Sequence, residues 1–159
     1  MKIKYTTFQV ALEIIGLLLM LGMILFICIK WSQIPDLVPG HYNAMGEIDR
    51  WGSKIEIIIL PLISIFIYAM LTGFSFFPET WNIPVKISDF NKETIYKCTR
   101  SFLIFMKVEV VGMFFYITYF TVTTQPLPSY FLPVQLLVIF GTLIYFIILI
   151  SKTEKKKRY

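Results

Sequence analysis

Residues 8–29, FQVALEIIGLLLMLGMILFICI, form a largely apolar run. An α-helix needs roughly 20 residues to cross a hydrocarbon core of about 30 Å, so this run predicts a transmembrane helix. Lys2 and Lys4 precede it, as they would in a signal peptide. The apolar core is too long for a typical signal sequence, and no A-x-A cleavage site follows it. We therefore expect the segment to remain as a membrane span.

Three further apolar runs follow, and they extend the prediction to the whole chain. They cover about residues 55–77, 102–122 and 132–150. The chain is 57% hydrophobic and 16% charged, whereas a soluble domain is roughly 45–50% apolar and 25% charged. The sequence thus predicts an all-α, polytopic membrane protein: a bundle of four transmembrane helices that forms a single domain over residues 1–159.

Local signals indicate where some of these helices begin. Ser53 and Glu56 have the spacing of a capping box at the start of the second span. Pro61 lies early in that span and predicts a kink. Asp89 is a candidate N-cap if the third helix extends backward as an amphipathic segment.

The distribution of lysine and arginine predicts the orientation. Residues 123–131 contain neither residue type, whereas residues 78–101 contain four such residues and the C-terminal tail contains five. The positive-inside rule then places both termini and residues 78–101 in the cytoplasm, and residues 30–54 outside. The basic residues flank apolar runs, which favours contact with the lipid bilayer and argues against direct binding of nucleic acid.

No residue pattern in the chain predicts a cofactor. Cys28 and Cys98 fall on opposite sides of the membrane in the expected topology, so a disulfide between them is not predicted. Neither a CxxC motif nor a zinc-binding spacing is present.

The loop at residues 30–54 is long for a connection between neighbouring helices, which usually takes 2–8 residues. Pro35 and Pro39 restrict its backbone, while glycines permit turns. Trp31 and Trp51 flank the loop and suit the membrane interface. These features predict an ordered extracytoplasmic cap between the first and second helices.

The segment PDLVPGHYNAMGEIDRWGSK, residues 35–54, resembles the signature of a family of small bacterial membrane proteins. That family is best known as the N-terminal domain of SdpI-like bacteriocin immunity proteins. The resemblance implies a protein of the bacterial cytoplasmic membrane that provides resistance to a secreted peptide toxin outside and captures a transcriptional repressor inside. Candidate ligand-binding or partner-binding residues are Asp36, His41, Asn43, Asp49, Arg50 and Trp51.

His41 is the only histidine, and its role has several interpretations. It could be a ligand, a proton acceptor or a sensor of external pH. The simpler alternative is a structural hydrogen bond to Asp36 or Asp49. A metal site that uses these three residues is a weak alternative, because zinc sites usually contain several histidines or cysteines. Asn43, with Gly46, is more simply interpreted as a turn.

Three charged residues lie inside the predicted spans: Glu13, Lys107 and Glu109. Charges within the membrane tend to pair or to mark function. Lys107 and Glu109 are two residues apart and do not share a helix face, so a Glu13–Lys107 pair is the expected arrangement. Glu109 then has no obvious partner and is a candidate for a proton-linked role.

These observations favour an immunity protein, envelope-stress sensor or signalling protein that binds a peptide through its outer loop. One alternative is a small transporter or a transporter accessory subunit, in which homo-oligomers could surround a pathway. A second is a membrane-surface enzyme that uses His41, although no nucleophile elbow or HExxH motif is present, so we do not predict an enzyme. The basic tail, residues 155–158, is expected to contact anionic lipid.

Overall fold

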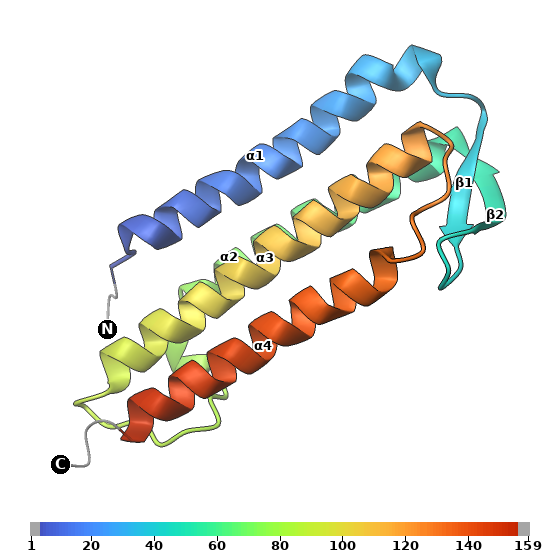
Figure 1. The fold of residues 1–159 in the computed structure, drawn as a ribbon. Coiled ribbons are helices and arrows are strands. Elements are labelled where there is room, and N and C mark those ends of the chain that lie inside the picture. Colours follow the sequence, from blue (N-terminus) through green and yellow to red (C-terminus); the bar gives the residue numbers. More distant parts are fainter. Residues whose placement is uncertain (1–3, 156–159) are drawn as a thin grey trace.

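The computed structural model describes residues 4–155, and its dominant feature is four long helices with a hairpin at one end (Figure 1). The basic residues Lys156–Arg158 and the N-terminal Lys2 lie outside the described residues. The helices are α1 (Thr7–Lys30), α2 (Ile59–Ser75), α3 (Lys92–Val122) and α4 (Phe131–Lys155). The strands are β1 (Leu37–Tyr42) and β2 (Ile48–Ser53), and short 3₁₀ helices cover Trp31–Gln33, Lys54–Ile58 and Pro78–Thr80.

All four helices are long and apolar enough to cross a membrane, which confirms the predicted fold class. The chain is therefore a multi-pass membrane protein. The third helix begins at Lys92, ten residues before the start of the apolar run at Phe102. Asn91 occupies its N-cap position, so the prediction of Asp89 as N-cap was wrong by two residues. Asn91 instead accepts a hydrogen bond from the Ser88 backbone N–H at 2.7 Å, which shapes the turn before the helix.

The second span does not begin as an α-helix. Residues Lys54–Ile58 form a 3₁₀ helix, and the α-helix starts at Ile59. Pro61 therefore lies in the first turn of α2, where an N–H group would lack an intrahelical acceptor and proline is tolerated. Pro61 thus lies just after the change from one helix type to the other, and the kink expected there remains a prediction.

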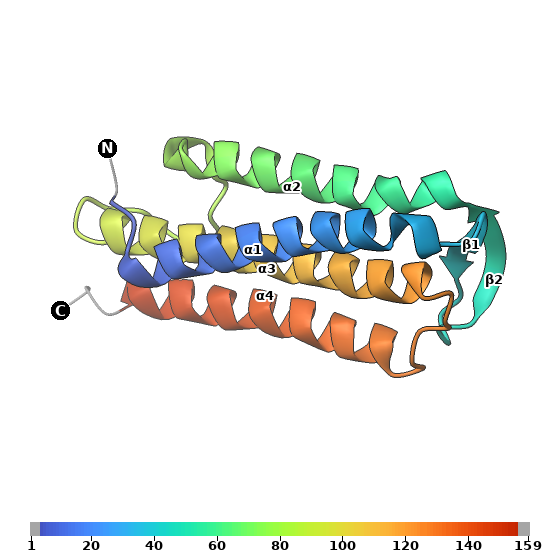
Figure 2. The same ribbon diagram turned by 90° about the horizontal axis from the view of Figure 1, so that it is seen from above.

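α3 is the central helix of the bundle, because α1, α2 and α4 all pack against it. Figure 2 shows α2 and α4 on opposite sides, with α1 lying over α3. The hairpin and the α3–α4 connection lie at one end of the bundle, which we call the hairpin end (Figure 1). α1 begins and α4 ends at the opposite end, which we call the terminal end. This arrangement puts residues 30–54 and 123–130 on one side, as four antiparallel spans require.

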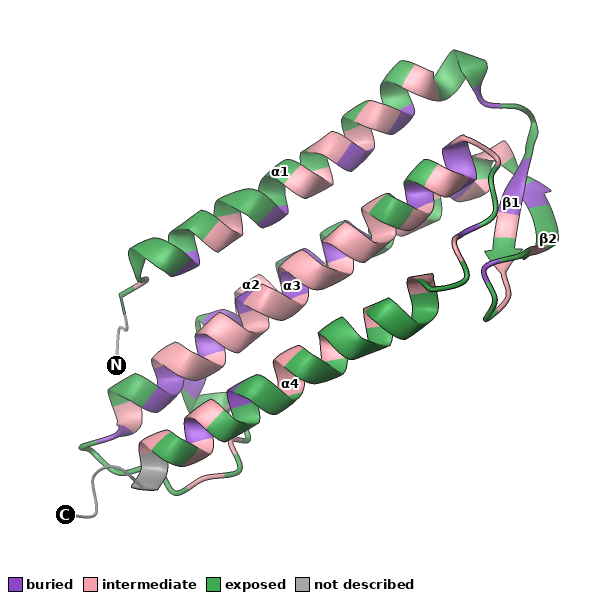
Figure 3. Cartoon of the chain, in the orientation of Figure 1, coloured by how far each residue is buried: buried purple, intermediate pink, exposed green. Residues whose placement is uncertain are grey.

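The outer surface of the bundle is apolar. α4 is mostly exposed along its length (Figure 3), and Leu137 on this helix is 75% exposed. On α1, Leu18 is 62% exposed. Soluble monomers rarely present contiguous apolar surface of this extent, whereas lipid tails cover it without cost.

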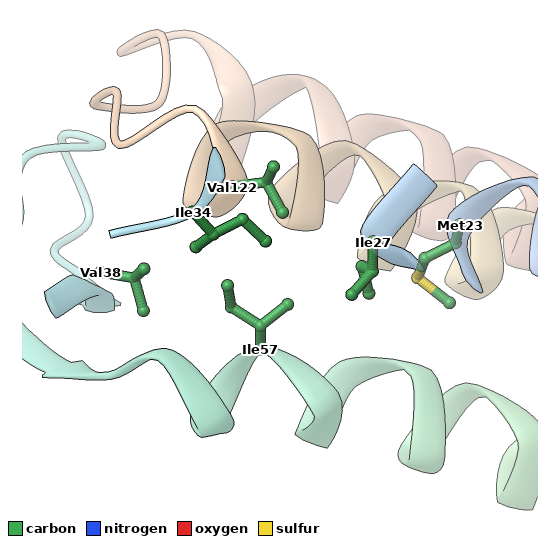
Figure 4. Close-up of a cluster of buried hydrophobic side chains, with 6 residues drawn as sticks. All are labelled: Met23, Ile27, Ile34, Val38, Ile57 and Val122. Atoms are coloured by element: carbon green, nitrogen blue, oxygen red, sulfur yellow. The ribbon is translucent and has the colours of Figure 1, made fainter. Parts of the chain in front are cut away.

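A buried apolar cluster attaches the hairpin to the helices. Its side chains come from α1, the segment between α1 and β1, β1 itself, the 3₁₀ helix Lys54–Ile58 and α3. They converge at the hairpin end (Figure 4). The members are Met23, Ile27, Ile34, Val38, Ile57 and Val122. Val38 is fully buried, so burial of one face of β1 contributes to holding the hairpin against the bundle.

The hairpin is an addition to the predicted all-helical architecture. β1 and β2 pair antiparallel, with Leu37 opposite Ser53 and Pro39 opposite Trp51. The register then shifts twice, since His41 lies opposite Arg50 and Tyr42 opposite Ile48. Gly40 and Asp49 are the extra residues of these two irregularities, which is the arrangement of β-bulges. The strands were not predicted because proline and glycine within a strand are poor β-formers.

Candidate functional site

Arg50 links the two strands and the start of the second span. Its Nη2 donates to the Gly40 carbonyl oxygen at 2.6 Å and to Glu56 Oε2 at 2.8 Å. The hydrogen bond to Glu56 and the opposite charge of that carboxylate raise the pKa of Arg50 above its usual value. A guanidinium group suits this position because it can donate in two directions at once.

Glu56 is the second member of this network. Its Oε1 accepts a hydrogen bond from the Ser53 backbone N–H at 3.1 Å, which is one half of the predicted capping box. Gly52 packs so tightly here that a Cβ atom at this position would lie 2.4 Å from Glu56 Oε1. Gly52 therefore leaves room for the Glu56 carboxylate, which accepts the hydrogen bond from Arg50.

Lys54 closes the base of the hairpin. Its Nζ donates to the carbonyl oxygens of Trp31 and Ile34, the latter at 3.1 Å, and lies 4.6 Å from the centre of the Trp31 ring. Its backbone N–H donates to the Asp36 carbonyl at 2.9 Å. Lys54 thus satisfies carbonyl groups at the end of α1, where helix ends are short of donors.

The β1–β2 turn is organised by Asn43, as predicted. Its Oδ1 accepts from the backbone N–H groups of Met45 and Glu47, and its Nδ2 donates to Glu47 Oε2 at 2.8 Å. Gly46 has a φ of +84°, a conformation that glycine adopts without steric cost.

The tip of the hairpin docks on the connection between α3 and α4. The Leu127 backbone N–H donates to the Gly46 carbonyl at 2.8 Å. Tyr42 Oη donates to the Gln125 carbonyl at 3.2 Å and lies 3.4 Å from Thr121 Oγ1. Partial burial raises the pKa of Tyr42. Sequence reasoning did not predict these contacts of Tyr42, because its partners lie about 80 residues away in the chain.

His41 Nδ1 lies 2.6 Å from Asp49 Oδ1, and both side chains are substantially exposed. This is the structural hydrogen bond that we gave as the simpler interpretation of His41. Within residues 4–155, no group of three or more His, Cys, Asp and Glu side chains could hold a metal ion. The structure therefore does not assemble Asp36, His41 and Asp49 into the metal site considered above.

A groove of about 570 Å³ lies beneath the hairpin, between α2, α3 and α4. The hairpin contributes one wall, which includes three of the candidate residues: His41, Asn43 and Arg50. The remaining candidates Asp36, Asp49 and Trp51 do not line it. The helices contribute a wall that is mainly apolar, made by residues such as Ile57, Leu60, Ile117, Phe131 and Leu132. The groove therefore offers polar groups along one edge and apolar surface along the other.

The predicted pair of Glu13 and Lys107 is present nearer the terminal end. Lys107 Nζ donates to Glu13 Oε1 at 2.5 Å and to Thr72 Oγ1 at 3.0 Å. Tyr68 Oη donates to Glu13 Oε2 at 2.5 Å, and Lys107 lies 4.6 Å from the Tyr68 ring centre. The Lys107 side chain is fully buried, and the network joins α1, α2 and α3. Its contacts explain these charges as part of the helix packing.

Glu109 lies apart from that network. Its Oε1 accepts a hydrogen bond from Thr142 Oγ1 on α4, a partner that sequence reasoning did not identify. Its Oε2 is buried and has no hydrogen-bond partner among the residues that the structure describes.

The hairpin lies within a segment that matches a known family. Residues 18–65 match a family described as "Domain of unknown function (DUF1648)". An uncharacterized protein of Archaeoglobus fulgidus is 46% identical over 39 residues, which is 24% of this chain and 21% of that protein. The chain thus matches only about a fifth of that relative's length. No solved structure matches the chain. The chain is an integral membrane protein that shares its segment 18–65 with an uncharacterized family, and the resemblance to SdpI-like proteins remains a prediction.

Proposed function

We propose that this protein is a membrane-embedded binding protein that receives an apolar segment of a peptide in the groove beneath its hairpin. The peptide would be a secreted toxin or an envelope signal, as for an SdpI-like immunity or sensor protein. The observation behind the proposal is the groove itself, which combines motif residues of the hairpin with apolar residues of three helices. Its volume of about 570 Å³ falls within the usual range of ligand sites, roughly 300–1,000 Å³.

The distribution of polar groups supports a peptide ligand. His41, Asn43 and Arg50 line the side formed by the hairpin, where they can hydrogen-bond to backbone groups. The apolar side formed by Ile57, Leu60 and other helix residues suits one or a few large side chains. Since the hairpin is fixed by Arg50, Asn43 and Tyr42, little ordering would accompany binding, which favours affinity.

The topology proposed for this function follows the lysine and arginine distribution. The hairpin end faces outward, and the terminal end lies in the cytoplasm of a bacterial cell. A cytoplasmic partner such as a transcriptional repressor would then meet the terminal end, at residues 76–91 between α2 and α3 or at the C-terminal tail. Binding at the hairpin end could reach that side through α3, which contacts all the other helices.

A matched pair of substitutions on α4 tests the groove. Leu132→Trp places a large side chain in the groove wall, whereas Leu137→Trp makes the same change on an α4 residue that does not line it. Bacteria that express each variant would be exposed to membrane-active peptides of two kinds, a cationic amphipathic helix and a neutral apolar peptide. Survival would be compared with cells that carry the empty vector, with membrane levels of each variant checked by immunoblot.

Cells with the wild-type protein or Leu137→Trp are expected to survive at least one of the two peptides better than cells with the empty vector. Cells with Leu132→Trp are expected not to be protected, although the variant is present in the membrane at the same level. Equal survival of all strains, vector included, contradicts a protective role. Protection by Leu132→Trp equal to wild type contradicts the groove as the binding site.

A further inference from the structure

A second cavity, of about 430 Å³ and open on one side, lies between α1, α3 and α4. Leu19 represents α1 in its lining, and Val134 and Val138 are among the α4 residues. Gly112 of α3 leaves room there, since a Cβ atom at this position would meet only Leu19 Cδ1, at 3.9 Å. The cavity shares Phe131 with the groove but is bounded by α1 in place of α2 and the hairpin.

Among the described residues that line this cavity, Glu109 is the only charged one. Thr142 satisfies Oε1, while Oε2 is buried without a hydrogen-bond partner among the described residues. A carboxylate oxygen that is buried without a hydrogen-bond donor lowers the stability of the protein. The loss is larger inside a membrane, where hydrocarbon surrounds the helices. A ligand in the cavity could supply the missing donor if the carboxyl group turns Oε2 toward it.

The neighbouring cation does not supply the missing partner. Lys107 is two residues from Glu109 but donates to Glu13 and Thr72 on the other side of α3. The cavity therefore presents an acidic group that a positively charged ligand could neutralise.

Aromatic rings lie at the other end of the cavity. Tyr116 and Phe131 are stacked, with ring centres 5.1 Å apart and an angle of 3° between the planes. Tyr116 is two helical turns beyond Glu109, about 10 Å along α3 at 1.5 Å per residue. An apolar or aromatic body attached to an ammonium group could thus lie along α3, with its charge at Glu109 and its ring near Tyr116.

We propose that this cavity binds a small lipophilic organic cation whose ammonium group donates to Glu109 Oε2. A primary ammonium is favoured over a quaternary one, because Oε2 requires a hydrogen-bond donor. Apart from Phe131, this site is lined by other residues than the groove, so the inference does not depend on the proposed peptide-binding function.

Binding of radiolabelled tryptamine to the purified protein in detergent tests the site. Tryptamine has a primary ammonium on an aromatic body, and tryptophol is its neutral isostere with a hydroxyl in place of the amine. A hydrogen bond to a charged group predicts that unlabelled tryptamine displaces the label at least about tenfold better than tryptophol. This comparison uses only the wild-type protein.

Two variants locate the bound cation. Glu109→Gln is expected to lower tryptamine affinity by at least about tenfold. Glu93→Gln makes the same chemical change on the same helix, at a residue paired with Lys97 on the surface, and should change affinity less than about twofold. Gly112→Leu fills the cavity and should abolish binding, with folding of each variant verified by size-exclusion chromatography.

Three outcomes would overturn the proposal. They are absence of saturable tryptamine binding to wild type, equal displacement by tryptophol, and wild-type affinity in Glu109→Gln. Loss of tryptamine binding leaves the peptide-survival assay unaffected, so failure of this site is distinguishable from failure of the groove.

Discussion

Arg50 and Gly40 are joined by a 2.6 Å hydrogen bond from the guanidinium Nη2 to the glycine carbonyl, and a Cβ atom at position 40 would lie 2.8 Å from that guanidinium. Gly40 is the extra residue of a bulge and has no partner opposite it on β2. Its carbonyl oxygen instead accepts a hydrogen bond from the Arg50 side chain. The irregular strand and the arginine therefore depend on each other. Replacement of either one should loosen the hairpin without affecting the helices.

The glycines of the hairpin should differ in their sensitivity to alanine. At Gly46 a Cβ would lie 2.3 Å from the Leu127 carbonyl oxygen, and φ is +84°, so Gly46→Ala should destabilise by about 1–3 kcal/mol. Gly40→Ala meets only the end of a flexible side chain and should cost less. Thermal unfolding in detergent, followed by circular dichroism, would measure the order.

Gly73→Ala is the control for that series, because nothing lies within 4 Å of its Cβ position. It is a helix residue, so alanine should be neutral or stabilising by up to about 1 kcal/mol. A Gly46→Ala protein as stable as Gly73→Ala would contradict the described docking of the hairpin on Leu127.

The Glu13–Lys107 pair should show strong coupling in a double-mutant cycle. Removal of one partner leaves a buried charge, so Glu13→Gln or Lys107→Met should each destabilise by roughly 3–5 kcal/mol. The stability loss of the double variant should be much smaller than the sum of the two single losses, because both charges are then absent. Unfolding in detergent mixtures would give the four free energies, and additive effects would show that the residues do not interact.

The His41–Asp49 pair should contribute little to stability. Both side chains are exposed, 63% for His41 and 42% for Asp49. His41→Gln and Asp49→Asn should therefore each change the free energy of unfolding by less than about 1 kcal/mol. If peptide protection falls in these variants while stability is unchanged, the pair acts in binding. A large stability loss would instead show that the bulge at Asp49 depends on this contact.

Cysteine labelling would establish the orientation. In a protein with Cys28→Ser and Cys98→Ser, Met45→Cys should react with a membrane-impermeant maleimide on intact cells, because Met45 is 66% exposed at the hairpin end. Lys152→Cys, near the end of α4, should react only after the membrane is opened. The reverse pattern would place the hairpin in the cytoplasm and remove the basis for an external peptide ligand.

The helical part of the fold was predictable because bilayer thickness translates directly into the length of an apolar run. Residues 8–29 lie within α1, and residues 132–150 within α4. The early part of α3 was less clear, since Lys92–Arg100 is polar and its helical structure depends on contacts such as the burial of Ile95 and Tyr96. Local capping signals placed the start of the second span correctly at Ser53 but that of the third incorrectly at Asp89.

The hairpin and the groove were not predictable in the same way. Pro39, Gly40 and Gly52 disfavour strands locally, and the contacts that compensate come from Arg50 and Glu56. The docking of Tyr42 and Gly46 on the α3–α4 connection joins parts of the chain separated by about 80 residues. Local sequence patterns contain no information about such pairs, although they correctly indicated the Asn43 turn.

The hydrogen bond from Leu127 to Gly46 has a consequence for the order of assembly. Membrane proteins are inserted from the N-terminus, so β1, β2 and α2 leave the ribosome before the α3–α4 connection exists. Until Leu127 emerges, the hairpin tip has neither its backbone partner nor the Tyr42 contact with Gln125. The segment that matches the family, residues 18–65, can thus form its strand pairing alone, but its tip can dock only after residues 125–127 have been synthesised.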